Sequence, residues 1–255
     1  MKRLPRRLRH GEEATLVEHL GELRARMVVA LLALAVGFII AYIFRGHLLH
    51  WLNQPLPPSK RKPVTFGVAE PFLTSMWVSL WAAFGLALPV ILWQVWSFFA
   101  PAFEVNKQRI VAAFVLFATV LLVGGVAFGY FVALPAAVHF LTSFDQNHYT
   151  ILIRARDYYS FATIVLMAVG VVFELPIFVL ALVRLGVLTT AKLRRNRRLG
   201  YVVMAAIAVA LPGVDPVTTT FEMIPLMLLY ECSIWLAVLM ERRWPSRELV
   251  APEPS

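Results

Sequence analysis

The sequence predicts an all-α integral membrane protein with six transmembrane helices and both termini on the cytoplasmic side. Three observations lead to this prediction. The 255-residue chain is 60% hydrophobic with a mean hydropathy of +0.72, which is too apolar for an ordinary soluble domain. Six apolar runs are long enough, or nearly long enough, to cross a bilayer. The positive charges between the runs fall mostly on one side.

The six runs are separated by connections that are charged or rich in proline. They cover approximately 27–44, 76–99, 110–134, 160–183, 201–212 and 221–240. The fifth run is short, because "LPGVDP" follows it and ends any helix. It spans a bilayer only where the membrane thins locally or neighbouring helices support it. The first run follows a long charged segment and precedes no A-x-A pattern, so we expect a retained span and not a signal peptide.

The distribution of positive charge predicts the orientation. Eighteen of the 24 Lys and Arg residues lie in the termini and the second and fourth connections, and six lie in the first and third. Such a bias places the richer side in the cytoplasm. The net charge of +9 shows no interleaved basic and aromatic pattern, so membrane topology explains it better than nucleic-acid binding. The predicted parts are a cytoplasmic segment with an interfacial amphipathic helix at 1–26, a single transmembrane domain at 27–240 and a cytoplasmic tail at 241–255.

Aromatic and proline residues mark the connections. The first outer connection contains "QPLPPSKRKP", which predicts a rigid segment rich in turns. We expect Tyr158, Tyr159 and Phe161 in an outer aromatic belt, and Trp93 and Trp96 in an inner one. In both cases the rings would anchor the protein at the membrane–water interface.

The segment "TLVEHLGELRARM", residues 15–27, predicts a helix at the membrane surface. Thr15 and Glu18 have the spacing of a capping box. Apolar residues then recur at helical spacing, namely Leu16, Leu20, Leu23 and Met27. Glu22 and Arg26 are four residues apart, so the simplest interpretation is an ion pair on an interfacial helix.

A carboxylate interrupts the apolar run "AVGVVFELPIFVLALV". Glu174 lies deep in this run, where a charge costs about 3 kcal/mol on insertion scales, so it needs a partner, water or a proton. Asp215 and Glu222 lie near the outer end of the last run, where they can snorkel or cap the helix. Prolines inside or at the edges of the runs predict kinked helices in a concave, partly hydrated bundle. They are Pro89, Pro135, Pro176, Pro212 and Pro225.

Signatures of catalysis are missing from the sequence. It contains no HExxH, no GxSxG and no pair of histidines at ligand spacing within one run. The single cysteine excludes a disulfide framework and a CxxC metal site. We therefore expect no enzyme, no catalytic residues, no metal and no organic cofactor.

Six segments of the chain resemble the TatC family, the multispanning core subunit of the twin-arginine (Tat) protein translocase. They are "HLGELRAR" (19–26), "AEPFLTSM" (69–76), "LPVILWQVWSFFAPA" (88–102), "GGVAFGYFVALPAAVHFL" (124–141), "GVVFELPIFVLALVRLG" (170–186) and "MIPLMLLYE" (223–231). The resemblance covers about residues 15 to 240 in order and spacing. It agrees with the six spans and internal termini predicted above.

The resemblance implies a receptor for export signals. It implies that the chain binds paired arginines of signal peptides at the cytoplasmic face of a prokaryotic plasma membrane. It also implies self-association, assembly with TatA- and TatB-like single-span subunits, and export of folded proteins driven by the proton-motive force. The residues implied in signal-peptide binding are Glu22, Arg24, Glu18, Glu104 and Phe98. Those implied in partner docking or as intramembrane polar sites are Glu174, Pro89, Pro55 and Asp215.

The chemistry of this ligand fits acidic residues. A guanidinium is a planar fork that pairs bidentately with a carboxylate, and lysine cannot copy that geometry. Two arginines need two such sites, or one carboxylate together with backbone carbonyls. Glu174 matches the intramembrane glutamate of the family, and we interpret it as a docking and gating site and not as a proton-pumping base.

The sequence departs from the family pattern in two places. In "APAFEVNKQRI" the position of the usual loop glutamate holds Lys107, and Glu104 lies three residues earlier. Either Glu104 takes that role, or Glu22 and Glu18 carry most of the binding. The family's "TPPD" before the last span is "LPGVDP" here, although Asp215 still aligns.

Two other functions are compatible with parts of the pattern. The first is a proton-coupled secondary transporter with Glu174 as its carrier site, which an internal repeat and a broken helix pair would support. The sequence shows neither feature. The second is a structural scaffold, which predicts tolerance of substitutions at Glu22 because a surface ion pair is worth at most about 1 kcal/mol.

Overall fold

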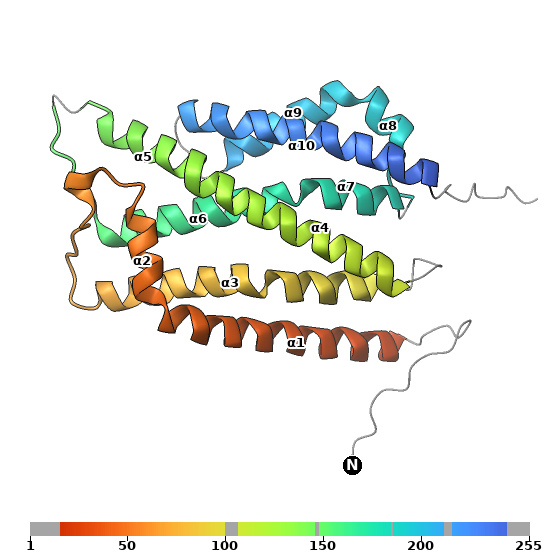
Figure 1. Ribbon diagram of the computed structural model, residues 1–255, viewed down its shortest axis with the longest axis horizontal. Helices are drawn as coiled ribbons and strands as arrows, with labels where there is room; N and C mark the ends of the chain where they lie inside the picture. Colours follow the sequence, from red (N-terminus) through yellow and green to blue (C-terminus); the bar gives the residue numbers. More distant parts are fainter. Residues whose placement is uncertain (1–15, 100–106, 146–147, 185, 212–215, 244–255) are drawn as a thin grey trace, which may run out of the picture.

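The prediction of an all-α protein is confirmed. The computed structural model describes residues 16–99, 107–145, 148–184, 186–211 and 216–243, most of which lie in helices (Figure 1). The longer helices are α1 (Leu16–Ile43), α3 (Glu70–Phe99), α4 (Lys107–Phe128), α6 (Ala155–Phe173) and α10 (Pro216–Arg243). The shorter elements are α2 (Arg45–Asn53), the 3-10 helix η1 (Pro58–Lys60), the π-helix η3 (Gly129–Ala133), α5 (Leu134–Ser143), α7 (Leu175–Arg184), α8 (Thr190–Arg195) and α9 (Arg197–Ala210).

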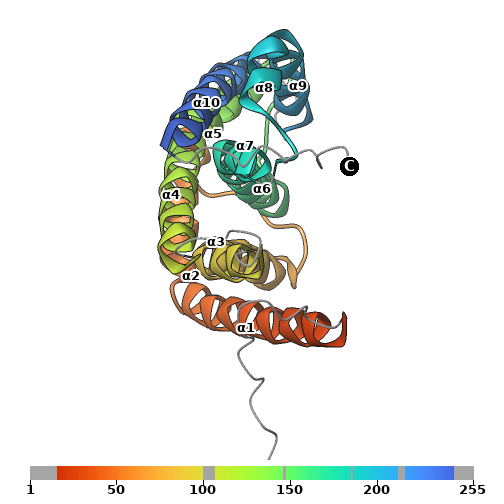
Figure 2. The ribbon, with the colours of Figure 1, turned by 90° about the vertical axis from the view of Figure 1, so that its right-hand side faces the viewer.

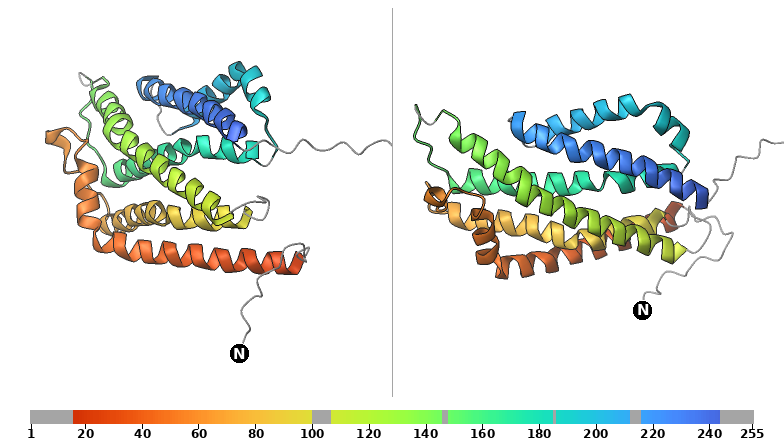
Figure 3. Two further views of the ribbon diagram at one scale, coloured as in Figure 1. Left: turned by 45° about the vertical axis from the view of Figure 1, so that its right-hand side comes forward. Right: turned by 45° about the horizontal axis from the view of Figure 1, so that its top comes forward.

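The helices run between two ends of the bundle. We call the end where α1 begins, and where α3, α7 and α10 end, the terminal face. The opposite end, which carries α2 and the connection from α2 to α3, is the loop face (Figure 1). In Figure 2 the helices α10, α4, α3 and α1 follow a curve, and α6 and α7 lie on its inner side. The helices α1 and α3 lie side by side in every view, as Figure 3 also shows.

Five segments are long and apolar enough to cross a membrane. They are Leu20–Ile43, Glu70–Phe98, Ala112–Ser143, Ala155–Arg184 and Pro216–Glu241. The fifth predicted run forms α9, whose 14 residues extend only about 21 Å, short of the roughly 30 Å of a hydrocarbon core. The structure therefore contains the short helix that the sequence predicts at this place, and the count of six spans stays a prediction.

The outer surface of α1 is apolar, as a lipid-facing helix requires. Leu31 is 62% exposed, and Leu32 and Ile39 are exposed to a similar degree. A soluble protein rarely leaves such a continuous apolar helix face in water. The lipid bilayer is the solvent that this surface fits.

Prolines act differently at different places in the helices. Pro89 and Pro225 lie inside α3 and α10, which continue through them. Pro135 follows the π-helix η3, and Pro176 follows the break between α6 and α7. A proline lacks the N–H that continues a helix, and a π-turn or a break absorbs that loss. As a result, α4, η3 and α5 form one long oblique element (Figure 1).

The crossing of α4 and α6 depends on two glycines. A Cβ atom added to Gly125 would come within 2.7 Å of the Phe173 Cβ and 2.9 Å of the Gly170 Cα. A Cβ on Gly170 would in turn meet the Val126 side chain at 3.0 Å. Small residues at a crossing let the helix backbones approach closely, which is the usual basis of helix packing in membranes.

Tyrosines hold α2 at the loop face. The Tyr159 hydroxyl donates to Asn53 Oδ1 at 2.9 Å, and the Tyr130 hydroxyl donates to the Trp51 carbonyl at 2.9 Å. The Tyr158 hydroxyl donates to the Leu52 carbonyl. The last carbonyls of a helix lack regular helical partners, so the hydroxyls of Tyr130 and Tyr158 cap α2, while that of Tyr159 holds the Asn53 side chain.

The predicted aromatic belts are therefore partly wrong. Tyr158 and Tyr159 are only 5% and 7% exposed, because they contact α2 and do not face the membrane interface. Trp96 is also buried, with its ring 5.2 Å from that of Phe114 on α4. Trp93 is 41% exposed, which fits the predicted position at the surface.

We predict that Gly125→Ala destabilises the protein and that Gly124→Ala does not. A Cβ at Gly125 meets backbone and ring atoms that cannot move away, and such overpacking costs about 2 kcal/mol. A Cβ at Gly124 meets no atom within 4 Å, and alanine in a helix gains up to about 1 kcal/mol over glycine. Thermal unfolding of the purified variants in detergent tests this. Equal midpoints for the two variants would contradict the close crossing.

Candidate functional site

Glu22 lies on the first turns of α1 at the terminal face. Arg26, one turn later, donates from Nε at 3.0 Å and from Nη2 at 2.5 Å to the Oε1 atom of Glu22. The predicted pair between these residues is thus confirmed. The Glu22 side chain remains 38% exposed, so its carboxylate is accessible from outside the protein.

The same arginine joins α1 to the end of α3. Its Nη2 atom donates to the Ser97 carbonyl at 3.2 Å, and Nη1 lies 3.5 Å from the Gln94 carbonyl and 3.5 Å from Gln94 Oε1. Ser97 lies in the last turn of α3, where carbonyls lose their helical partners and the helix dipole is negative. Together, Glu22 and this helix end form an acceptor site of one carboxylate and two backbone carbonyls, which suits a guanidinium.

The other residues predicted for signal-peptide binding are described only in part. Arg24 is exposed on α1, and Phe98 is half-buried next to Ser97 near the end of α3. Glu18 belongs to α1, but its side chain lies outside the described residues, as does the whole of Glu104. The structure therefore brings Glu22 to the end of α3 that carries Phe98, and it does not place the second acidic residue.

Glu174 is buried at the break between α6 and α7. It is 2% exposed, and neither carboxylate oxygen has a hydrogen-bond partner among the described residues. The Glu174 carbonyl accepts from the N–H groups of Ile177 at 3.0 Å and Phe178 at 3.2 Å, so its backbone starts the turn into α7. The carboxyl group thus sits in an apolar interior where the helix is interrupted.

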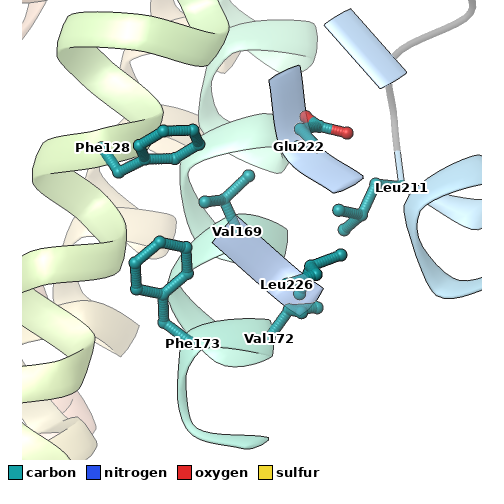
Figure 4. A pocket seen from close by; sticks show the side chains of 7 residues that line it. All are labelled: Phe128, Val169, Val172, Phe173, Leu211, Glu222 and Leu226. Atoms are coloured by element: carbon teal, nitrogen blue, oxygen red, sulfur yellow. The ribbon is translucent and has the colours of Figure 1, made fainter. Parts of the chain in front are cut away.

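Glu222 on α10 is a second buried acid, and the prediction that it snorkels is wrong. It is 1% exposed, and it lies in the interior of the bundle together with residues of α4 and α6. Figure 4 shows it beside a small cavity of about 10 Å³. The residues that line this cavity are Phe128, Val169, Val172, Phe173, Leu211, Glu222 and Leu226.

The remaining predicted docking residues are far apart in the fold. Pro89 is half-buried inside α3, and Pro55 is half-buried in the turn that follows α2 at the loop face. Asp215 lies outside the described residues. Neither the cavity beside Glu222 nor the pocket between Leu49 and Tyr159 at the loop face is lined by Glu174, Pro89 or Pro55.

Comparison with known proteins identifies the family. A model of the family described as Sec-independent protein translocase protein (TatC) matches residues 18–225. The chain belongs to the TatC family. It is 35% identical over 224 residues to the Sec-independent protein translocase protein TatC of Carboxydothermus hydrogenoformans, covering 88% of this chain and 92% of that protein. It is 34% identical over 250 residues to the protein of the same name from Desulforapulum autotrophicum, covering 97% and 93%.

A solved structure agrees with this assignment. The crystal structure of the twin arginine translocase receptor TatC in DDM has a TM-score of 0.75 and 33% identity, and the match covers 86% of this chain and 99% of that one. This TatC family member is therefore a multi-pass membrane protein and a Tat translocase component, not an enzyme.

Sequence reasoning missed Glu70, which organises the loop face of this TatC family member. Glu70 is 6% exposed, and Arg154 donates to it from Nε at 3.0 Å and Nη2 at 3.3 Å. The backbone N–H groups of Phe66, Gly67 and Arg156 also donate to its carboxylate. An acid directly before Pro71 at a helix start was the available signal. A parallel bridge between Val64 and Arg154 completes the link between the two connections at the loop face.

Sequence reasoning also missed the polar contacts of Glu231. Arg197 on α9 lies 3.3 Å from Glu231 Oε2 on α10, and the Tyr201 hydroxyl donates to Oε1 at 2.5 Å. The Thr190 hydroxyl of α8 donates to Glu241 near the end of α10. The contacts of Glu231 hold the short helix α9 against α10, and the contact of Glu241 holds α8 against the end of α10.

We predict that Glu70→Gln loosens the loop face. The amide loses the charge-assisted bonds to Arg154 and to three backbone N–H groups, at a cost of about 2 kcal/mol. The rate of trypsin cleavage after Lys60 and Arg61 should rise with the population of the open connection. Asp157→Asn, an exposed acid in the first turn of α6, is the matched control and should leave the rate nearly unchanged. Equal cleavage of both variants would contradict the organising role of Glu70.

Proposed function

We propose that this chain is the receptor subunit of a Tat translocase. It binds twin-arginine signal peptides at its terminal face and scaffolds TatA- and TatB-like single-span subunits, which export folded proteins with the proton-motive force. The observation that carries the proposal is the exposed Glu22 carboxylate beside two backbone carbonyls at the end of α3. Family membership favours this function over a secondary transporter.

In this proposal each predicted residue has a chemical role. Glu22 receives one arginine of the signal in a bidentate pair. The second arginine binds Glu18, or Glu104 from the connection after α3. Arg24 donates hydrogen bonds to the backbone carbonyls of the peptide. Phe98 packs against its apolar residues, since it is half-buried beside Ser97.

The proposed orientation places the terminal face in the cytoplasm of a prokaryotic cell. Residues 1–26 then form the cytoplasmic segment, residues 27–240 the transmembrane domain and residues 241–255 the cytoplasmic tail. The fifth of the six proposed spans is α9, held against α10 by Glu231. The supporting argument is the bias of positive charge, since most Lys and Arg residues lie at the terminal face or in the termini.

Glu174 is the proposed docking and gating site for a partner helix. A buried carboxyl group whose hydrogen-bonding capacity is unused among the described residues favours a polar side chain from another helix. The break after α6 gives that helix access to a polar group at depth. Pro89, Pro55 and Asp215 act as further contacts in this assembly, and self-association brings several such chains together.

We predict that Glu22→Ala removes the preference for arginine. The purified protein in detergent should bind a synthetic Arg-Arg signal peptide more tightly than its Lys-Lys twin. Loss of one charge-assisted pair should weaken Arg-Arg binding by about tenfold to a hundredfold and leave Lys-Lys binding nearly unchanged. Asp157→Asn at the loop face is the control, and Glu104→Ala shows whether the second connection contributes. Equal binding of both peptides by the unmodified protein would refute the receptor function.

We predict that Glu174→Gln keeps more export activity than Glu174→Ala. Glutamine retains hydrogen-bonding groups of the same size, whereas alanine leaves a cavity and no polar partner. Export of a folded reporter from cells that depend on each variant measures this. If glutamine abolishes export as fully as alanine does, a charge or a titrating proton is required at this site, and the docking interpretation is wrong.

A further inference from the structure

The geometry points to Arg26 as a resident occupant of the receptor's own guanidinium site, which a signal-peptide arginine enters by displacing it. The site consists of Glu22 on α1 together with Gln94 and Ser97 on α3. This inference rests on the proposed receptor function. It adds which group fills the site when no signal peptide is bound, and how the site selects arginine.

All three nitrogens of the Arg26 guanidinium have acceptors in this site. Nε and Nη2 donate to Glu22 Oε1, Nη2 also reaches the Ser97 carbonyl, and Nη1 faces the carbonyl and the side-chain oxygen of Gln94. A planar fork with donors on three nitrogens fits such a set, whereas an ammonium donates from one point. The site therefore discriminates by shape as well as by charge.

The position of Arg26 allows it to leave. Its side chain is 22% exposed and that of Glu22 is 38% exposed, so both are reached from outside the protein. The two contacts of Nη1 are long, at 3.5 Å, and close to the limit of a hydrogen bond. Both described hydrogen bonds to Glu22 go to Oε1, so Oε2 accepts none of them.

The packing of α1 on α3 does not depend on this arginine. The two helices are in contact along their length, and at Gly37 an added Cβ would lie 3.0 Å from the Ala83 carbonyl. Their close approach in the middle of the bundle holds them together when Arg26 moves. Other contacts between α1 and α3 therefore fix the helix end at which Arg26 lies.

A resident guanidinium has two consequences for recognition. It neutralises Glu22 in the empty receptor, so a lysine-bearing segment gains little by entering a site that it fits poorly. It also lowers the apparent affinity for the true signal, because the peptide binds only the fraction of molecules in which the site is open. Specificity is increased at the expense of affinity.

The first experiment probes the site with a small ion, without a signal peptide. In Arg26→Ala the vacated site should bind methylguanidinium at millimolar concentration, which raises the thermal midpoint of this variant. Methylammonium at the same concentration, the lysine analogue, should not raise it. The unmodified protein and the control Arg45→Ala, which removes an arginine at the loop face, should respond equally to both salts. An equal response of Arg26→Ala to both salts overturns the guanidinium site.

The second experiment measures peptide binding. Arg26→Ala should bind the Arg-Arg peptide about tenfold more tightly than the unmodified protein, because no resident group has to leave. Arg26→Lys, which keeps a cation and protects against a folding defect, should show a gain in the same direction. Methylguanidinium should compete with the peptide in Arg26→Ala.

Two failures are distinguishable. Unchanged or weaker Arg-Arg binding by both Arg26 variants, with arginine preference intact in the unmodified protein, overturns displacement and makes Arg26 a positioning residue for Glu22. Absence of arginine preference in every protein, including the unmodified one, overturns the receptor function and displacement with it. In that case the response of Arg26→Ala to methylguanidinium still shows whether the site binds guanidinium in preference to ammonium.

Discussion

A bilayer offers no water to an unpaired backbone group, and the rest of this structure follows from that constraint. It forces the apolar runs into helices, and it makes every helix end and every break a place that needs donors or acceptors. The end of α2 is capped by tyrosine hydroxyls, and the start of α3 is organised by Glu70, which gathers three backbone N–H groups and Arg154. These polar side chains act where one helix ends and the next begins.

The candidate signal site is one of these helix ends. The carbonyls in the last turn of α3 need donors, and Arg26 supplies one to the Ser97 carbonyl while it pairs with Glu22. In the proposed receptor function, an arginine of a signal peptide uses the same acceptors. One set of atoms then satisfies the helix end through Arg26 and binds the guanidinium of the ligand.

The acids Glu174 and Glu222 are buried more deeply than Glu22 and Glu70, which have arginine partners. Glu174 sits at a break whose backbone is satisfied, yet its carboxylate has no partner among the described residues. Glu222 is buried on the neighbouring helix α10, next to a cavity too small for a ligand. For Glu174, a partner helix that carries a polar residue would relieve the cost of burying the carboxyl group.

Sequence alone determined the helical class, the positions of the long apolar helices, the short fifth helix and the pairing of Glu22 with Arg26, because these depend on local composition and on residues one turn apart. It misjudged Tyr158, Trp96 and Glu222, because whether a side chain faces lipid or a neighbouring helix depends on how helices rotate and cross. Three contacts join residues that lie 45 to 84 positions apart in the sequence. They are the crossing of α4 on α6 at Gly125, the link from Glu70 to Arg154 and the contact of Arg26 with α3. Only the tertiary structure decided these, because helical periodicity carries no information about which distant segment a helix face will meet.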